Sequence, residues 1–191
     1  MEKGIGILGG TFDPPHNGHL FLASTLSSLP FIGQLVIIPT FKPRYKDPIS
    51  SYTARCCMSK ATFENYRTSV FESTKSYIFE QLAELKEDVK GPLYLFVGDD
   101  WDINSWKNPD QIRKLAKVIY IRRQFSGKLY EDIKLEPFMH KDFIINLPIT
   151  LDISSTKIRY MAQRGMPIEG LVHPDVALII KTRGLYGLPK A

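Results

Sequence analysis

Residues 5–23 read IGILGGTFDPPHNGHLFLA, and this stretch carries the strongest structural signal in the chain. A short apolar run comes first, paired glycines follow, and a helix-like apolar pattern begins after the second histidine. This order predicts a strand, a glycine turn and a helix. Small glycines let the backbone approach a ligand, and the N–H groups at a helix N-terminus favour an anion. His16 and His19 are expected in the first turn of that helix, where their spacing directs both imidazoles toward one phosphate.

A second glycine pattern overlaps this stretch. Gly4, Gly6 and Gly9 match the G-x-G-x-x-G spacing of dinucleotide-binding proteins. That fingerprint needs a strand before the first glycine and an acidic residue about 20 positions after the pattern. Too few residues precede Gly4 to form a strand, and residues 28–30 read SLP. We therefore assign Gly4 and Gly6 to the first strand and expect no hydride-transfer cofactor.

The composition is that of a globular chain with an affinity for anions. At 191 residues with 43% hydrophobic side chains, one domain spanning residues 1–191 is expected. The net charge of +5 favours partners such as nucleotides, but the basic residues are spread out, so no nucleic-acid binding is expected. No segment approaches the length of a membrane span, so no membrane contact is expected. Cys56 and Cys57 are adjacent and lack zinc-ligand spacing, which indicates a reducing, cytoplasmic location and no protein-bound metal.

Short apolar segments alternate with helical patterns along the chain. Strands are expected at Ile5–Leu8, Leu35–Ile38, Val70–Glu72, Leu93–Val97, Val118–Ile121 and Phe143–Asn146. Helices are expected at Gly18–Leu29, Ser51–Tyr66, Ser76–Glu87, Pro109–Leu115, Ser155–Arg164 and Asp175–Arg183. This alternation predicts an α/β fold: a doubly wound, mostly parallel, Rossmann-like sheet with helices on both faces. Ligands bind such sheets beyond the carboxyl ends of the strands, so the loops after the first, second and fourth strands are expected to form the site.

A second candidate phosphate site lies near the C-terminus, where residues 153–159 read ISSTKIR. Ser154 is a good helix N-cap, and capping alone would explain the hydroxyl residues. The alternative is a phosphate site in which Ser155, Thr156 and backbone N–H groups bind oxygens, with charge added by Arg159 one turn later. The presence of the first motif favours this second interpretation.

With both motifs, the chain resembles nucleotidylyltransferases that carry H-x-G-H and I-S-S-T-x-I-R motifs, and more closely the bacterial nicotinate-nucleotide adenylyltransferases. Further similarities are RCCM at residues 55–58, GDD at 98–100 and LY at 185–186. The resemblance implies catalytic roles for His16, His19 and Arg159. It implies nucleotide binding by Gly9, Gly10, Thr11, Phe12, Gly98, Asp100, Ile153, Ser154, Ser155 and Thr156.

The loops near the acceptor pocket depart from the family pattern. The family often has P-P-H-K after its second strand, whereas residues 41–44 read FKPR, and its R-P-G is here RRQ at residues 122–124. Of its Y-T-x-D-T segment only Tyr77 is kept. These departures concern the acceptor more than the chemistry. The resemblance implies acceptor binding by Lys42, Arg44, Tyr77, Trp106 and Arg122.

The implied reaction transfers the adenylyl group of ATP to nicotinate mononucleotide, giving nicotinate adenine dinucleotide and pyrophosphate in NAD biosynthesis. Mg²⁺ would be held mainly through the ATP phosphates, so few protein carboxylates are needed. Two alternatives stay open. One is the same transfer to nicotinamide mononucleotide or another phosphorylated acceptor, and the other is a non-catalytic nucleotide- or RNA-binding module. The sequence also leaves open a homo-oligomer.

Overall fold

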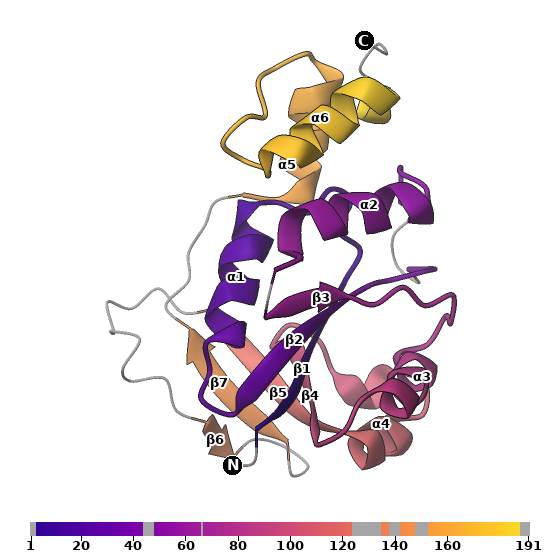
Figure 1. Ribbon diagram of the computed structural model, residues 1–191, viewed down its shortest axis with the longest axis vertical. Helices are drawn as coiled ribbons and strands as arrows, with labels where there is room; N and C mark the ends of the chain where they lie inside the picture. Colours follow the sequence, from indigo (N-terminus) through magenta and orange to yellow (C-terminus); the bar gives the residue numbers. More distant parts are fainter. Residues whose placement is uncertain are drawn as a thin grey trace.

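A seven-stranded sheet forms the centre of the computed structural model, which describes residues 3–43, 48–65, 67–123, 135–137, 142–147 and 153–187 (Figure 1). The strand order is β3-β2-β1-β4-β5-β7-β6. Neighbouring strands run parallel, except that β6 pairs antiparallel with β7. The strands are β1 (Gly4–Gly10), β2 (Ile32–Pro39), β3 (Thr68–Val70), β4 (Leu93–Gly98), β5 (Ala116–Arg123), β6 (Leu135–Pro137) and β7 (Phe143–Leu147).

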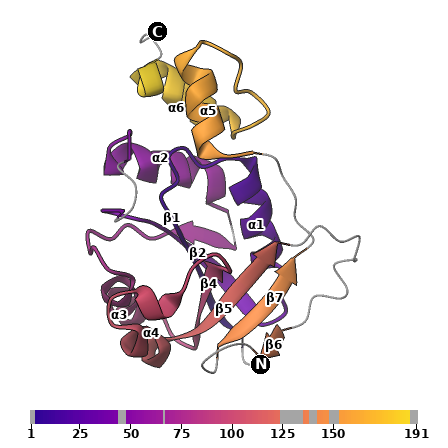
Figure 2. The same ribbon diagram turned by 180° about the vertical axis from the view of Figure 1, so that it is seen from behind.

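Helices cover both faces of this sheet. Helices α1 and α2 lie over one face, α3 and α4 lie over the other, and α5 and α6 form a layer beyond α1 and α2 (Figures 1 and 2). The α-helices are α1 (Asn17–Ser27), α2 (Tyr52–Phe63), α3 (Ile78–Asp88), α4 (Pro109–Leu115), α5 (Ser155–Gln163) and α6 (Pro174–Arg183). Two short 3₁₀ turns, η1 (Ile103–Ser105) and η4 (Leu185–Gly187), complete the described elements.

The central strand β1 shows why the sheet is apolar on both sides. Leu8 belongs to a buried cluster that includes Leu26 of α1, whereas its neighbour Ile7 belongs to a second cluster with Leu82 of α3 and Ile112 of α4. Successive side chains of a strand point to opposite faces. A strand that is covered on both faces therefore reads as a continuous apolar run, as it does in this sequence.

A third buried cluster attaches the C-terminal helices to the rest of the molecule. Met58 of α2 packs there with Ile158 of α5 and with Val176 and Ile180 of α6. The contact places α5, which begins in the second motif, beside α1 and α2 (Figure 1).

The predicted doubly wound, mostly parallel fold is confirmed, with shifts at several boundaries. The third strand covers Thr68–Val70 rather than Val70–Glu72. Helix α2 ends at Phe63, before the predicted end, because Asn65 forms an Asx-type turn in which its side-chain oxygen accepts from the N–H of Arg67 at 2.8 Å. The sequence pattern does not predict β6, since three residues ending in proline give no period-2 signal.

The assignment of Gly4 and Gly6 to the first strand is also confirmed, and packing accounts for both glycines. A Cβ on Gly4 would lie 2.2 Å from the carbonyl oxygen of Pro92, and one on Gly6 would lie 2.9 Å from Leu35 and from Phe96. Among the described residues, no helix combines the length and the apolar character that crossing a bilayer requires.

Candidate active site

The first motif forms the turn between β1 and α1. Phe12 adopts a left-handed backbone conformation with φ of 51°, and its ring lies against Gly10, where a Cβ would come within 2.7 Å of the ring. A side chain at position 10 would displace that ring.

The expectation that both histidines lie in the first helical turn is wrong for His16. His16 is the N-cap residue of α1, whereas His19 is the third helical residue.

The two imidazoles stack on each other. Their ring centroids are 3.7 Å apart and their planes differ by 26°. The backbone N–H of His16 donates to Nδ1 of His19 at 3.2 Å. A neutral imidazole that accepts at Nδ1 carries its proton on Nε2, so His19 has a donor at Nε2.

Burial keeps His16 neutral near pH 7. Its side chain is only 7% exposed, and this burial lowers the pKa of His16 from 6.5 to about 4. The cause is that the imidazolium form loses its hydration when water is excluded. His16 can therefore hydrogen-bond as a neutral ring, and positive charge for a phosphate must come from other groups such as Arg159.

The depressed pKa of His16 predicts that stability falls as the pH is lowered from about 6.5 to about 4. In this window the unfolded chain binds a proton at His16 that the folded chain does not, so acid favours unfolding, by about 1–2 kcal/mol between pH 7 and pH 5. Urea unfolding at pH 7, 6 and 5 measures this. His16→Gln should show a shallower pH dependence than the wild type. Parallel pH profiles for wild type and His16→Gln would contradict the expectation.

Asp13 fixes the first motif to two distant parts of the chain. Its Oδ2 accepts from the backbone N–H of Ile49 at 2.8 Å and of Ser50 at 3.4 Å, and its Oδ1 accepts from the hydroxyl of Tyr186 at 2.7 Å. These bonds tie the turn to the loop before α2 and to η4 near the C-terminus. Both carboxylate oxygens of this buried side chain are therefore engaged by protein donors.

The second motif forms the N-terminus of α5 and contacts the first motif directly. Ser154 is the N-cap, as predicted, and its hydroxyl accepts from the N–H of Lys157 at 3.2 Å. The hydroxyl of Ser155 donates to the carbonyl of Pro14 at 2.8 Å. Arg159 donates from Nη1 to the carbonyl of Asp13 at 2.8 Å. Two segments nearly 140 residues apart are therefore in direct contact.

Arg159 is also linked within its own helix, where Nη2 donates to the hydroxyl of Thr156 at 3.2 Å. The guanidinium is thus oriented by one contact from α5 and one from the first motif. This arrangement places a cation beside the histidine turn without any carboxylate partner among the described residues.

A pocket of about 490 Å³ opens where β1, β2 and β4 end, which is the edge predicted for the site. Of the predicted residues, those that line it are Gly9, Gly10, Thr11, Phe12, His19, Lys42, Tyr77, Gly98, Asp100 and Trp106. The walls also include Trp101, Ser105 and Lys107, which belong to neither motif and are not among the predicted site residues. The pocket combines glycine-rich backbone, aromatic side chains and two lysines.

Other predicted residues lie outside the lining of this pocket. The second motif, Ile153 to Arg159, contacts the turn at Asp13 and Pro14 instead. Arg122 forms an ion pair with Asp99, with Nε 3.2 Å from Oδ2. Arg44 lies outside the described residues.

Arg55 fixes two loops beside the pocket, a role that the sequence does not reveal. It reaches from α2, and its side chain is 1% exposed. Nη1 donates to the carbonyls of Thr11 and Thr40, each at 2.8 Å, and Nη2 donates to that of Phe41 at 3.2 Å. Burial lowers the pKa of Arg55, although the nearby Asp13 carboxylate opposes the shift. The side chain joins the two loops that follow β1 and β2.

No group of three or more His, Cys, Asp or Glu side chains in the described ranges is arranged to hold a metal ion. Of the carboxylates in the predicted motifs, Asp13 accepts from three donors, Asp99 pairs with Arg122, and Asp100 lines the pocket. A metal ion at this site would take most of its ligands from a bound phosphate and water.

Comparisons with known proteins agree with the motifs. The model of the cytidylyltransferase-like family matches residues 7–161. A probable nicotinate-nucleotide adenylyltransferase of Clostridium tetani is 34% identical, with 96% of this chain and 99% of the relative covered. The protein of the same name in Borrelia hermsii is 30% identical, with 95% and 97% covered.

A solved structure with the same fold supports the architecture. The nicotinic acid mononucleotide adenylyltransferase of Plasmodium falciparum, complexed with NaAD, superposes with a TM-score of 0.75. The match covers 98% of this chain and 99% of that chain at 20% sequence identity. At that identity the likeness shows a shared fold.

Proposed function

Because this chain belongs to the cytidylyltransferase-like family, and within it to the nicotinate-nucleotide adenylyltransferases, we propose that it transfers the adenylyl group of ATP to nicotinate mononucleotide in NAD biosynthesis. The products are nicotinate adenine dinucleotide and pyrophosphate. The observation that carries the proposal is the direct contact between the two motifs. Ser155 and Arg159 bind the backbone of the turn that leads into His16 and His19.

The proposed chemistry is one in-line displacement at phosphorus. A phosphate oxygen of the mononucleotide attacks the α-phosphorus of ATP, the bond from that phosphorus to the bridging oxygen breaks, and the electron pair leaves with pyrophosphate. The nucleophile is already an anion at neutral pH, so no strong general base is required. Catalysis then rests on orientation and on stabilising charge. The described residues of the site fit this requirement, since they include hydrogen-bond donors and a cation.

Each motif residue has a proposed role in that displacement. Nε2 of His19 donates to an α-phosphate oxygen. The neutral ring of His16, which stacks on that of His19, also stabilises the α-phosphate as charge builds. Arg159, Ser155 and Thr156 bind the leaving pyrophosphate at the N-terminus of α5, where backbone N–H groups also favour an anion. The remaining nucleotide contacts come from Gly9, Gly10, Thr11, Phe12, Gly98, Asp100, Ile153 and Ser154.

The acceptor is proposed to occupy the aromatic end of the pocket. Trp106 and Tyr77 line the pocket, and Lys42 and Lys107 add positive charge to its lining, which suits the carboxylate of a nicotinate ring. Arg44 remains a proposed acceptor contact from the resemblance. Arg122 also remains a proposed acceptor contact, because its ion pair with Asp99 runs through Nε and a guanidinium carries further donors at Nη1 and Nη2.

Mg²⁺ is proposed to enter with ATP as part of the substrate. The ion would bridge phosphate oxygens and neutralise charge as pyrophosphate leaves. The described residues fit such an ion better than a protein-held one, because they hold no cluster of three His, Cys, Asp or Glu side chains and the carboxylates of Asp13 and Asp99 are already engaged. We also propose that residues 1–191 act as one nucleotidylyltransferase domain in the cytoplasm, which the unpaired state of Cys56 and Cys57 supports.

A pyrophosphate-release assay tests the function. Purified protein is mixed with MgATP and, in separate reactions, with nicotinate mononucleotide, nicotinamide mononucleotide, phosphopantetheine and a sugar phosphate. We expect release with nicotinate mononucleotide at the highest kcat/KM and formation of the dinucleotide in equal amount. Faster release with another acceptor would move the function to that acceptor. ATP binding without release in any reaction would favour a non-catalytic binding module.

A further inference from the structure

The two tryptophans of the chain lie at the ends of one short segment. Trp101 and Trp106 both line the pocket, with ring centroids 6.1 Å apart and planes at 74°. Between them the backbone makes the single turn η1, in which the N–H of Trp106 donates to the carbonyl of Ile103 at 3.0 Å. We refer to residues 101–106 as the tryptophan wall.

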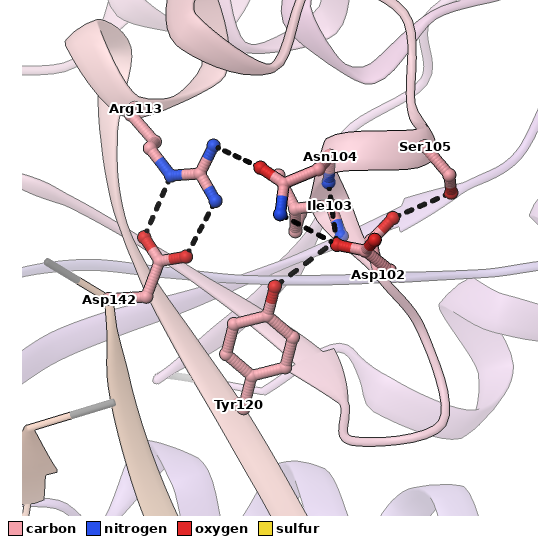
Figure 3. Close-up of polar contacts among 7 residues, drawn as sticks. All are labelled: Asp102, Ile103, Asn104, Ser105, Arg113, Tyr120 and Asp142. Carbon is pink, nitrogen blue, oxygen red and sulfur yellow. Dashed lines mark hydrogen bonds and ion pairs between the residues drawn. The ribbon is translucent and has the colours of Figure 1, made fainter. Parts of the chain in front are cut away.

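Polar contacts fix the backbone of the tryptophan wall (Figure 3). Asp102 caps η1, and its Oδ1 accepts from both the backbone N–H and the side-chain amide of Asn104, each at 2.9 Å. The hydroxyl of Ser105 donates to the carbonyl of Asp102 at 2.7 Å. Ile103 is fully buried, and its N–H donates to the hydroxyl of Tyr120 at 3.4 Å.

Arg113 connects this wall to the sheet. From α4, its Nε and Nη2 donate to the two oxygens of Asp142 at 3.0 and 2.8 Å, just before β7 begins. Its Nη1 donates to the side-chain oxygen of Asn104 at 3.1 Å. The side chains of Arg113 and Asp142 are 18% and 3% exposed, so the bidentate pair is largely shielded from water. The planar guanidinium therefore has a fixed orientation.

We propose that Arg113 is a positioning residue for the acceptor, acting through Asn104 and Asp102 to fix the tryptophan wall. A continuous series of hydrogen bonds links the buried carboxylate of Asp142, through Arg113 and Asn104, to Asp102 at the N-cap of η1. The amide nitrogen of Asn104 donates to Asp102 and its amide oxygen accepts from Arg113, so the orientation of the amide is determined. The identity of the acceptor rests on the proposed function, whereas the positioning of the wall does not.

Asn104→Ala is the primary test, since it breaks the link and leaves the ion pair of Arg113 with Asp142 in place. Asn104 is exposed, so folding should survive. We expect the KM for nicotinate mononucleotide to rise about 5- to 20-fold, the effect of losing one or two hydrogen bonds, with kcat and the KM for ATP within about twofold of wild type. Arg113→Lys keeps the positive charge but loses the planar set of guanidinium donors. It should raise the KM for nicotinate mononucleotide selectively as well, by a smaller factor.

Asn65→Ala is the matched control, because Asn65 is another exposed asparagine that holds a turn but does not line the pocket. It should leave both KM values unchanged. Equal rises in the two KM values for Asn104→Ala, or a loss confined to kcat, would overturn the proposal.

Tryptophan fluorescence gives a readout that does not need activity. Both tryptophans belong to the wall, so acrylamide quenching reports on this segment alone. Quenching should increase in Asn104→Ala at unchanged melting temperature and in Arg113→Lys at a temperature where the variant is folded, and should stay at the wild-type value in Asn65→Ala. Unchanged quenching in the first two variants would overturn the proposal. A wild-type protein that releases no pyrophosphate would reject the proposed function, while the quenching result would still decide the role of Arg113.

Discussion

His19→Ala is expected to lower kcat for pyrophosphate release by a factor of about 10²–10³, by analogy with the loss of one preorganised donor to a developing negative charge. The structure gives the reason. His19 lines the pocket at the end of β1, and its Nδ1 accepts from the backbone N–H of His16, so the proton is on Nε2. A donor fixed in this way costs no reorganisation when charge builds on the α-phosphate. Steady-state kinetics with MgATP and nicotinate mononucleotide measure the effect.

Replacing His19 by asparagine or glutamine can distinguish the roles of its two ring nitrogens. Asparagine carries its oxygen near the position of Nδ1, so His19→Asn should keep the contact with His16 and still lose most activity. Glutamine can carry its amide nitrogen near the position of Nε2, so His19→Gln should recover part of the rate. Full activity in His19→Ala with an intact fold would exclude the proposed mechanism. Equal rates in the two amide variants would exclude Nε2 as the essential donor.

The control for these variants is His173→Ala. His173 caps α6, and its Nδ1 accepts from the N–H of Asp175 at 3.3 Å, outside the pocket lining. Its loss removes a helix cap, worth about 1 kcal/mol of stability. The turnover of this variant should match the wild type, which would show that a general loss of stability does not explain the effect at position 19.

The fold could be predicted because its signals are local. The strand Leu35–Ile38 is apolar throughout and is covered by helices on both faces, and the glycine turn after β1 marks the start of α1. The predicted elements are wrong where the apolar pattern is too short to show a period, or where a side-chain hydrogen bond ends a helix. Three-residue β6 has no usable period, and the Asx-type turn at Asn65 stops α2 before the predicted end.

The site could be predicted only in part, because some of its contacts depend on tertiary structure. The motifs around His19 and Arg159 are visible in the sequence, since each places phosphate-binding residue types at a helix N-terminus. The burial that keeps His16 neutral comes from packing that no local pattern shows. The pairing of Arg122 with Asp99 and of Arg113 with Asp142 joins residues from different elements, so neither could be read from spacing.

Arg55→Met is expected to lower the free energy of unfolding by about 3–5 kcal/mol, comparable to breaking a buried charged contact. Methionine fills a similar volume but donates no hydrogen bond. The carbonyls of Thr11, Thr40 and Phe41 would each lose a charged donor inside the protein. Urea unfolding at pH 7 measures the change. Arg55→Lys should restore part of it, since an ammonium group can donate to fewer of these carbonyls in one position.

The same substitution should weaken the binding of both substrates. Arg55 joins the loop after β1, which carries Phe12, to the loop after β2, which carries Lys42, and both loops line the pocket. The KM values for ATP and for the acceptor should therefore rise together at a temperature where the variant is folded. This pattern differs from Asn104→Ala, for which only the acceptor KM should rise.

Arg164→Met is the matched control for Arg55→Met. Arg164 is exposed at the end of α5, with its guanidinium 3.7 Å from the centre of the Tyr160 ring, and surface contacts of this kind contribute about 0.5–1 kcal/mol. A loss below about 1 kcal/mol in both arginine variants would contradict the role assigned to Arg55. A large loss at position 55 alone would mean that a buried cation, bonded to no carboxylate among the described residues, holds the two loops together. The sequence shows only an arginine near the start of a helix, and the three carbonyls that explain it come from loops on two other strands.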